Sequence, residues 1–548
     1  MTARRRSEGW LFYGGALLDA PRAAKAAPAR GAAAKTKRSR DRAEALLVRG
    51  GVIEAVGPLA SLRKLAGRGI EPYGLQGGAL LPGFVDAHVH LVTWLRALRD
   101  PVFSGEQTPR ALETLVRARE KSLRPSEWIT IRGWVAREWP ASLLVRETLD
   151  RIAPARPLLL HAADGHSVWA NGPALAAAGV GSGARDPEGG VIGRDPRGEM
   201  TGHLIEEAAN LVRPHVPRLD DPKQELFDAV AAARKLGITS AHDFDRTSAG
   251  RRAAQELDRE GALGIRLLLS VPVAVLESAE ELGLLNGFGS DRLRIGPVKM
   301  FADGTLGSST ALLEAPYEGT GNVGIAVTPP SELREKTIRA ARAGLTVAIH
   351  AIGDRAVRHA LDAIEAALAE GRRFPAPPRV EHVQLAREED FARFARLGVA
   401  ASVQPVHLLT DRDLAGRIWG ARTGRSYAWK SLLRARAALY FGSDAPFDKA
   451  GPIAGLAAAI LRRDPAKHSD PYHPEQRLRL SDALRAHVEA PHAAAGWTPR
   501  LGRLLPGWGA DLVALSHDLR DRPPEEWSRI RVRETWVAGS NRVRKKGY

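Results

Sequence analysis

Two histidines, His88 and His90, follow a short apolar run and could together bind a metal ion. The run covers residues 79–85, is interrupted by a Pro-Gly pair, and leads directly into Asp86-Ala-His-Val-His90. Because side chains alternate between the two faces of a β-strand, residues two apart point the same way. Two imidazoles at one end of a buried strand are a ready pair of ligands for a divalent metal. From these residues alone, two buried structural histidines are the alternative.

Four further polar residues lie within or just after other apolar runs. Lys299 lies in Leu293-Arg-Ile-Gly-Pro-Val-Lys-Met-Phe, His350 ends Leu345-Thr-Val-Ala-Ile-His, His382 follows Val380-Glu, and Asp444 follows Leu439-Tyr-Phe-Gly-Ser. In a barrel of parallel strands the carboxyl-terminal strand ends all lie on one face, so these side chains would converge. Their number and order predict a metal-dependent catalytic site at that face.

The elements that would position these residues alternate between strand-like and helix-like patterns. This alternation predicts an α/β fold, a TIM-like (β/α)8 barrel, with functional residues at the carboxyl ends of its strands. The expected strands are 81–90, 238–244, 265–271, 293–302, 345–351, 379–385, 398–404 and 437–444, and the expected helices are 222–236, 249–261, 331–343, 354–370 and 387–396.

The remaining segments predict two additions to the barrel domain, which we place at residues 81–500. Strand-like runs near both ends predict a small β-sandwich domain formed jointly by residues 1–80 and 501–548. The stretch at about 105–220 is too long for one βα loop, so we expect an inserted α+β subdomain after the first barrel strand. Residues 21–41 are rich in Ala, Arg and Lys and predict an exposed, poorly ordered loop.

The composition limits the class of protein and its partners. The chain has 548 residues, of which 44% are hydrophobic, and it lacks cysteine, which excludes disulfides, cysteine-ligated zinc and a cysteine nucleophile. No apolar run approaches the ~20 residues of a membrane span, and the basic N-terminus lacks the apolar centre of a signal peptide. We therefore expect a cytoplasmic protein that does not bind membranes.

The net charge of +17 could indicate a nucleic-acid partner. However, the excess of arginine is spread along the whole chain, so we expect a small-molecule substrate and no nucleic-acid partner. The oligomeric state is open from the sequence, and a homodimer is expected only as the commonest soluble assembly.

Several segments resemble the metal-dependent amidohydrolase superfamily, and in particular its YtcJ-like branch, which includes N-substituted formamide deformylases. The resemblance covers nearly the whole chain, and its main departure is the stretch 21–41, away from the expected site. The matching segments are Leu81-Pro-Gly-Phe-Val-Asp-Ala-His88, Asp164-Gly-His-Ser-Val-Trp-Ala-Asn171, Val298-Lys-Met-Phe-Ala-Asp-Gly-Thr-Leu-Gly-Ser308, Ile349-His-Ala-Ile-Gly-Asp-Arg355, Val380-Glu-His-Val-Gln384, Ser402-Val-Gln-Pro-Val-His407 and Phe441-Gly-Ser-Asp444.

The resemblance implies one or two divalent metals per chain, with zinc favoured although other divalent metals accept the same ligands. It also implies that Asp444 is the catalytic acid–base residue. The implied ligands are His88, His90 and Asp444 for the more buried metal, His350 and His382 for a second, and a carbamylated Lys299 as the bridge between them. The alternative is an unmodified Lys299 paired with Asp303 beside a single metal.

Other residues receive supporting roles in this interpretation. We expect Asp303 to orient metal ligands from behind, and His166, His407 and Trp94 to contact substrate. The reaction implied is hydrolysis of a non-peptide C–N bond, in an amide or formamide, by metal-activated hydroxide. The alternatives are another amidohydrolase reaction, on a cyclic amide, an ester or an amine to be deaminated, and a non-catalytic regulatory or nucleic-acid-binding barrel.

Overall fold

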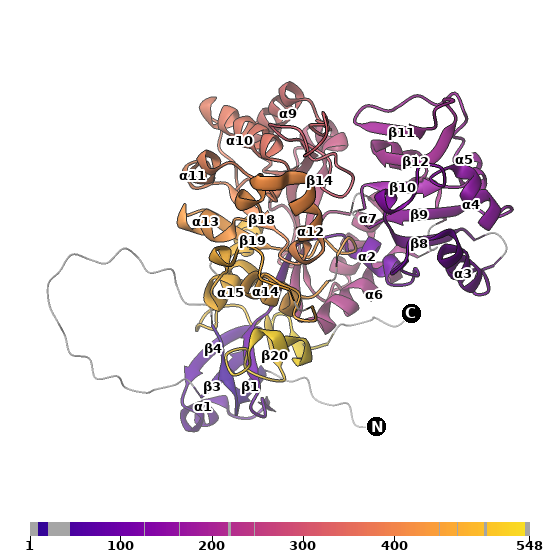
Figure 1. Cartoon of the computed structure of the whole chain (residues 1–548). Coiled ribbons are helices and arrows are strands. Elements are labelled where there is room, and N and C mark those ends of the chain that lie inside the picture. The colour runs from indigo at the N-terminus through magenta and orange to yellow at the C-terminus, as the bar shows by residue number, and fades with distance from the viewer. Residues whose placement is uncertain are drawn as a thin grey trace.

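A computed structural model describes residues 9–19, 44–124, 127–163, 165–217, 221–245, 247–448, 450–467, 469–497 and 501–542 (Figure 1). The loop predicted at 21–41 lies outside the described residues.

Eight parallel strands form one sheet in sequence order, and each coincides with a strand predicted from the sequence. The backbone N–H of Asp444 donates to the carbonyl of His88 at 2.7 Å, and that of His90 donates to Ala445 at 3.0 Å. These bonds join the end of the last strand to the first, so the sheet is nearly closed and the predicted TIM-like barrel is confirmed. The strands are β7 (Phe84–Val89), β13 (Ile238–Asp243), β14 (Arg266–Pro272), β15 (Leu293–Phe301), β16 (Val347–Ala351), β17 (Arg379–His382), β18 (Ala400–Val403) and β19 (Ala438–Phe441).

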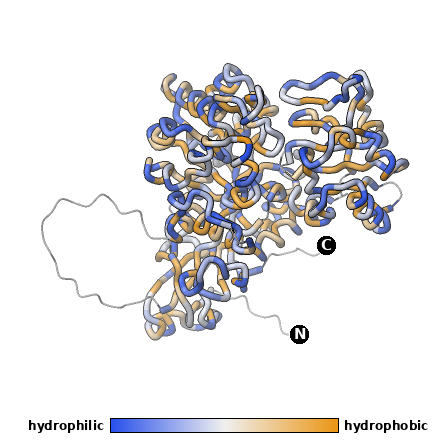
Figure 2. The backbone as a smooth tube through the Cα atoms, in the orientation of Figure 1, coloured by the Kyte–Doolittle hydropathy of each residue, from blue (hydrophilic) through white to orange (hydrophobic). Residues whose placement is uncertain are grey.

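Helices surround the barrel, and several of them are amphipathic. In α10 (Asp354–Ala369) the buried positions include Val357, Leu361 and Ile364, which recur at the spacing of one helical face. Hydrophilic and hydrophobic stretches accordingly alternate along the outer helices (Figure 2). The others are α2 (Leu91–Ala97), α6 (Pro222–Lys235), α7 (Ser248–Arg259), α8 (Leu276–Glu281), α9 (Pro330–Arg342), α11 (Glu388–Arg396), α12 (His407–Trp419), α13 (Trp429–Arg434), α14 (Pro452–Leu461) and α15 (Leu480–Val488).

The two ends of the chain build one small β-domain, as predicted. Strand β6 pairs antiparallel with β20, which joins the N-terminal and C-terminal segments in one sheet. Phe12, Leu46, Leu512 and Trp536 pack in a core shared by both sheets. The first sheet contains β1 (Gly9–Tyr13), β3 (Ala45–Arg49), β4 (Val52–Gly57) and β5 (Ile70–Gly74), the second β2 (Ala16–Leu17), β6 (Ala79–Pro82), β20 (Leu512–Leu515) and β21 (Val532–Trp536), and α1 (Leu59–Ala66) follows β4.

The insertion after the first barrel strand is a separate α+β unit beside the barrel, as predicted (Figure 1). It has its own core around Trp134 and Trp169. Arg132 Nη1 donates to the carbonyl of Pro446 at 3.0 Å, which holds the insert against the loop after the last barrel strand. Its elements are α3 (Pro109–Glu120), β8 (Ile129–Trp134), α4 (Arg146–Ile152), β9 (Leu158–Ala162), β10 (Ser167–Ala170), α5 (Gly172–Ala177), β11 (Gly190–Arg194) and β12 (Met200–Glu206).

Among the described residues, every helix is too short or too polar to cross a bilayer.

A buried ion pair joins the barrel to the terminal β-domain and gives a stability prediction. Arg266 of β14 donates from Nε and Nη2 to Asp511 at 2.6 and 3.1 Å, and Asp511 is only 3% exposed. Replacing Asp511 by asparagine leaves the guanidinium buried without its counter-charge. We expect the free energy of unfolding at neutral pH to fall by about 3–5 kcal/mol. Urea unfolding of D511N and wild type measures this loss.

The same pair predicts a pH dependence. Burial alone would raise the pKa of the Asp511 carboxyl, but Arg266 holds it below its usual range. The stabilisation is therefore complete above the ordinary aspartate pKa of about 4 and is lost as the pH falls through the folded-state value. Removing the exposed carboxylate in E113Q, the matched control, should change stability by less than about 1 kcal/mol. Equal losses in D511N and E113Q would contradict the prediction.

Candidate metal centre

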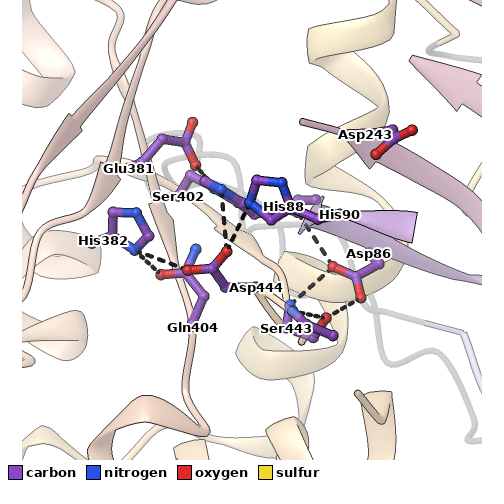
Figure 3. Close-up of polar contacts among 12 residues, drawn as sticks. Asp86, His88, His90, Asp243, Glu381, His382, Ser402, Gln404, Ser443 and Asp444 are labelled. Carbon is purple, nitrogen blue, oxygen red and sulfur yellow. Dashed lines mark hydrogen bonds and ion pairs between the residues drawn. The ribbon is translucent and has the colours of Figure 1, made fainter. Parts of the chain in front are cut away.

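At the carboxyl end of the barrel, Asp444 lies between His382 on one side and His88 and His90 on the other (Figure 3). Its Oδ1 is 3.5 Å from His88 Nε2 and 3.4 Å from His90 Nε2, and its Oδ2 is 3.9 Å from His382 Nδ1. One ligand atom from each of His88, His382 and Asp444 lies within 4.8 Å of the other two. Two imidazoles and a carboxylate at this spacing could hold a divalent cation.

The protonation states of these side chains also favour metal binding. Asp444 Oδ1 is buried and has no hydrogen-bond partner within the described part of the chain. Burial alone would raise the pKa of Asp444, but the neighbouring His88 and His90 hold it well below its usual range. Burial lowers the pKa of His88 to about 4 and that of His382 well below its ordinary value. Neutral imidazoles and an ionised carboxylate are the forms that bind metals.

Two of these residues have unusual backbone conformations. His382 has φ +74° and Asp444 has φ +54°, both in the left-handed region. Non-glycine residues adopt this region at a cost of about 1–3 kcal/mol, and such residues cluster at functional sites. Because both are predicted ligands, the strain supports a functional role for the turns that carry them.

Asp86 couples the strands that carry His88 and Asp444. Its Oδ2 accepts from Ser443 Oγ at 2.6 Å, and its Oδ1 accepts from the Ser443 N–H at 2.9 Å (Figure 3). The N–H of His88 donates to the same Oδ1 at 3.3 Å. Burial raises the pKa of Asp86 to about 6. The carboxyl therefore fixes the backbone of His88 relative to Ser443, the residue before Asp444.

Gly442 permits the close approach of β19 to His88. A Cβ at this position would lie 2.4 Å from the backbone nitrogen of His88 and 2.7 Å from its Cβ. We expect G442A to displace His88 and to weaken metal binding about 10- to 100-fold, the loss typical of misplaced ligand supports. Competition with a chromogenic chelator measures the affinity. In G416A, the control, the added methyl meets open space, and equal affinities in the two variants would contradict the prediction.

Lys299 and His350 line the same cavity as His88, His90, His382 and Asp444. Lys299 is 4% exposed, and its Nζ lies 4.8 Å from the ring centroid of Phe244 and 4.9 Å from that of Phe301. The His350 and His382 rings are 4.5 Å apart between centroids. The structure therefore brings all six predicted ligands to one cavity.

Asp303, which we expect to orient metal ligands, lies next to His350. Its Oδ1 is 3.6 Å from His350 Nε2. The carboxylate accepts backbone N–H groups from Leu312, Ile352 and Gly353 at 2.9, 3.0 and 2.8 Å. Burial raises the pKa of Asp303 to about 8. These bonds hold the loops after β15 and β16 together beneath His350.

Of the predicted substrate contacts, His166 and His407 lie at the site. His166 comes from the insert and lines the cavity, with its ring 5.3 Å from that of His350. Its Nδ1 is 2.7 Å from Glu206 Oε2. His407 Nε2 is 3.8 Å from Asp444 Oδ2. Trp94 instead packs in the hydrophobic core of α2 and α6 and is not among the described residues that line the cavity.

The sequence analysis missed several charged residues at the site, of which three make contacts that bear on its geometry. Glu206 and Thr310 bond through Oε1 and Oγ1 at 2.7 Å, which ties the insert to the loop after β15. Glu381 accepts from His88 Nδ1 at 2.6 Å, and Arg379 is its ion-pair partner. Two charges spaced two apart in the buried strand Arg379-Val-Glu-His382 were an available signal for this pair. Glu206 is the last residue of an ordinary strand, and its sequence context gave no comparable signal.

The chain belongs to the amidohydrolase family, whose sequence profile matches residues 73–542. It is 35% identical over 517 residues to Protein LONG AFTER FAR-RED 3 of Arabidopsis thaliana, covering 91% of this chain and 88% of the relative. It is 30% identical to YtcJ of Bacillus subtilis (strain 168), which is named as an amidohydrolase, covering 91% and 96%. The resemblance inferred from the sequence motifs is thereby confirmed.

Two further comparisons bear on the reaction and on the fold. The chain is 27% identical to the N-substituted formamide deformylase of Arthrobacter pascens, covering 92% of this chain and 96% of the relative. The crystal structure of an uncharacterized metal-dependent hydrolase from Pyrococcus horikoshii OT3 superposes with a TM-score of 0.72 at 27% identity, covering 94% and 98%. Together with the buried His88, His382 and Asp444, these findings make the chain a member of a family of metal-dependent hydrolases.

Proposed function

We propose that this protein hydrolyses a non-peptide C–N bond, in an N-substituted amide or formamide, using one or two divalent metals. The observation that carries the proposal is the buried cluster of His88, His382 and Asp444, in which the Asp444 carboxylate keeps an oxygen without a hydrogen bond. The formamide deformylase of Arthrobacter pascens supports the choice of bond.

We assign the metal-binding roles as the superfamily pattern implies. His88, His90 and Asp444 hold the more buried ion, and His350 and His382 hold a second. Zinc is our expected metal, since it accepts histidine and carboxylate ligands. A divalent metal supplies Lewis acidity, which lowers the pKa of water towards 7 and polarises a carbonyl oxygen.

Lys299 is our candidate bridging residue. An ammonium group is a poor neighbour for two dications, because like charges disfavour its protonated form. Addition of carbon dioxide to the neutral Nζ forms an N–C bond, releases a proton and gives a carbamate anion with two oxygen atoms. The burial of Lys299 beside His350 and His382 supports this assignment.

Asp444 is the proposed proton carrier of the reaction. Its carboxylate accepts a proton from the attacking water and delivers it to the leaving nitrogen when the C–N bond breaks. Its low pKa keeps the carboxylate ionised at neutral pH. The products are a carboxylate and an amine.

Residues of the insert line the proposed substrate pocket, opposite the predicted metal ligands. Glu206 holds His166 at 2.7 Å, so that the imidazole can bond a polar group of a small-molecule substrate. Phe301, Val327 and Phe447 line the same cavity and provide apolar surface for the substituent on nitrogen. His407, next to Asp444, is a second candidate contact.

Hydrolysis assays of the metal-loaded protein test this proposal. The panel contains N-alkyl and N-aryl formamides, the matching acetamides, cyclic amides, and esters of the same acids. Equal release of amine and carboxylate from a formamide or amide is the expected result. Hydrolysis of the esters or cyclic amides alone would move the assignment to another amidohydrolase reaction. No turnover of the panel by protein that carries metal would contradict the proposal.

A further inference from the structure

Beneath the metal-binding face, the interior of the barrel contains an ion pair in place of aliphatic side chains. Arg379 and Glu381 lie two residues apart on β17, point to the same face of the strand, and are each 0% exposed. Both the Nε and the Nη2 of Arg379 donate to the Glu381 carboxylate, the latter at 3.1 Å. Burying an ion pair costs several kcal/mol of desolvation unless further bonds satisfy it.

Further bonds hold the guanidinium in place. Arg379 also donates to Ser402 Oγ at 2.7 Å, to the carbonyl of Ala87, and to His242 Nδ1 at 2.8 Å. An arginine side chain has only donors, so each of these partners must accept. The orientation of Glu381 is therefore set by contacts from four different barrel strands.

Glu381 in turn acts on a predicted metal ligand. Its Oε2 is 2.6 Å from Nδ1 of His88, and both side chains are buried (Figure 3). An ionised carboxylate can only accept, so His88 Nδ1 must carry the proton. In a neutral imidazole the lone pair then lies on Nε2. That nitrogen is the one that faces Asp444 Oδ1, at 3.5 Å.

We propose that Glu381, held by Arg379, is a positioning residue that fixes the tautomer of His88 so that Nε2 is the metal-binding atom. The inference rests on the proposed metal site but assigns a residue outside the ligand set. Carboxylates that orient metal-binding histidines in this way tune affinity by about 10- to 100-fold.

The variant E381Q gives a specific expectation. Glutamine has nearly the same shape as glutamate, but an NH₂ group replaces one of the two accepting oxygens. Its amide oxygen should face Arg379 Nε, which can only donate. The NH₂ group then faces His88 Nδ1, which must become an acceptor, and the imidazole proton moves to Nε2. This change places a hydrogen on the atom that would bind the metal, whereas E381D is shorter but retains the acceptor.

Zinc affinity of the full chain, measured by chelator competition, separates tautomer control from packing. We expect E381Q to bind zinc about 10- to 100-fold more weakly than wild type, and E381D to lose less affinity than E381Q. If Glu381 acted only through packing, the shape-conserving E381Q would be the milder change. D413N, which removes an exposed carboxylate on α12 away from this network, is the control and should bind within about threefold of wild type.

Each outcome bears on the proposal. Circular dichroism and thermal unfolding of the metal-free variants establish that they are folded. Zinc binding by E381Q as tight as by E381D, or as tight as by wild type, would overturn the tautomer assignment alone. If E381Q does not fold, loss of zinc binding by a folded E381D would overturn it. A wild-type protein that binds neither zinc nor any other divalent metal would overturn both this inference and the proposed function.

Discussion

Replacing Asp444 by asparagine is expected to lower kcat/KM for amide hydrolysis by about 10³-fold, within the range for loss of a general acid–base group. The amide is nearly the same size as the carboxylate, so the fold should be preserved. It cannot accept the proton of water, and it presents a neutral group where His88 and His90 lie 3.5 and 3.4 Å from an anionic oxygen. Steady-state assays at neutral pH with the preferred amide measure the effect.

The control for D444N is D413N, which removes a carboxylate that is 80% exposed on α12. It should leave kcat/KM within about twofold, because surface ion pairs contribute little. A D444N protein that retains more than one tenth of the wild-type kcat/KM would remove Asp444 from the proposed mechanism.

Removing the metal is expected to abolish activity reversibly. After treatment with a chelator and dialysis, hydrolysis should fall below detection, and zinc should restore it while magnesium should not, since magnesium prefers oxygen ligands. Binding to the native state alone also stabilises it, by about 4 kcal/mol at free zinc one thousand times the Kd. The thermal midpoint should therefore rise when zinc is returned. Unchanged turnover after chelation would contradict a metal-dependent reaction.

The barrel and the convergence of its candidate ligands were predictable because several strands are apolar runs with a polar residue near or just beyond the carboxyl end. In a barrel of parallel strands, the carboxyl ends of all strands lie on one face. Polar residues at those ends therefore meet in one place, where functional sites form. His88, His350, His382 and Asp444 follow this rule. The composite β-domain was also predictable. Strand-like runs occur near both termini, and strands need hydrogen-bonded neighbours, so the two sets were expected to pair with each other.

Other parts of the site depend on contacts between distant segments and could not be predicted in the same way. Glu206 reaches the cavity only because the insert docks on the barrel through Thr310 and Pro446. Trp94 illustrates the reverse case. The helix α2 starts immediately after His90, and which of its faces turns inward is decided by packing against α6, which places the indole in the core.

Metal content per chain, measured on protein purified without chelator and supplied with zinc, tests the central claim most directly. We predict at least one bound ion in the wild-type protein and about two if Lys299 bridges a binuclear site. In K299A the content should then fall to one or none, whereas one ion in both proteins would indicate a mononuclear hydrolase with a minor role for Lys299. A folded wild-type chain that binds no divalent metal would contradict the account.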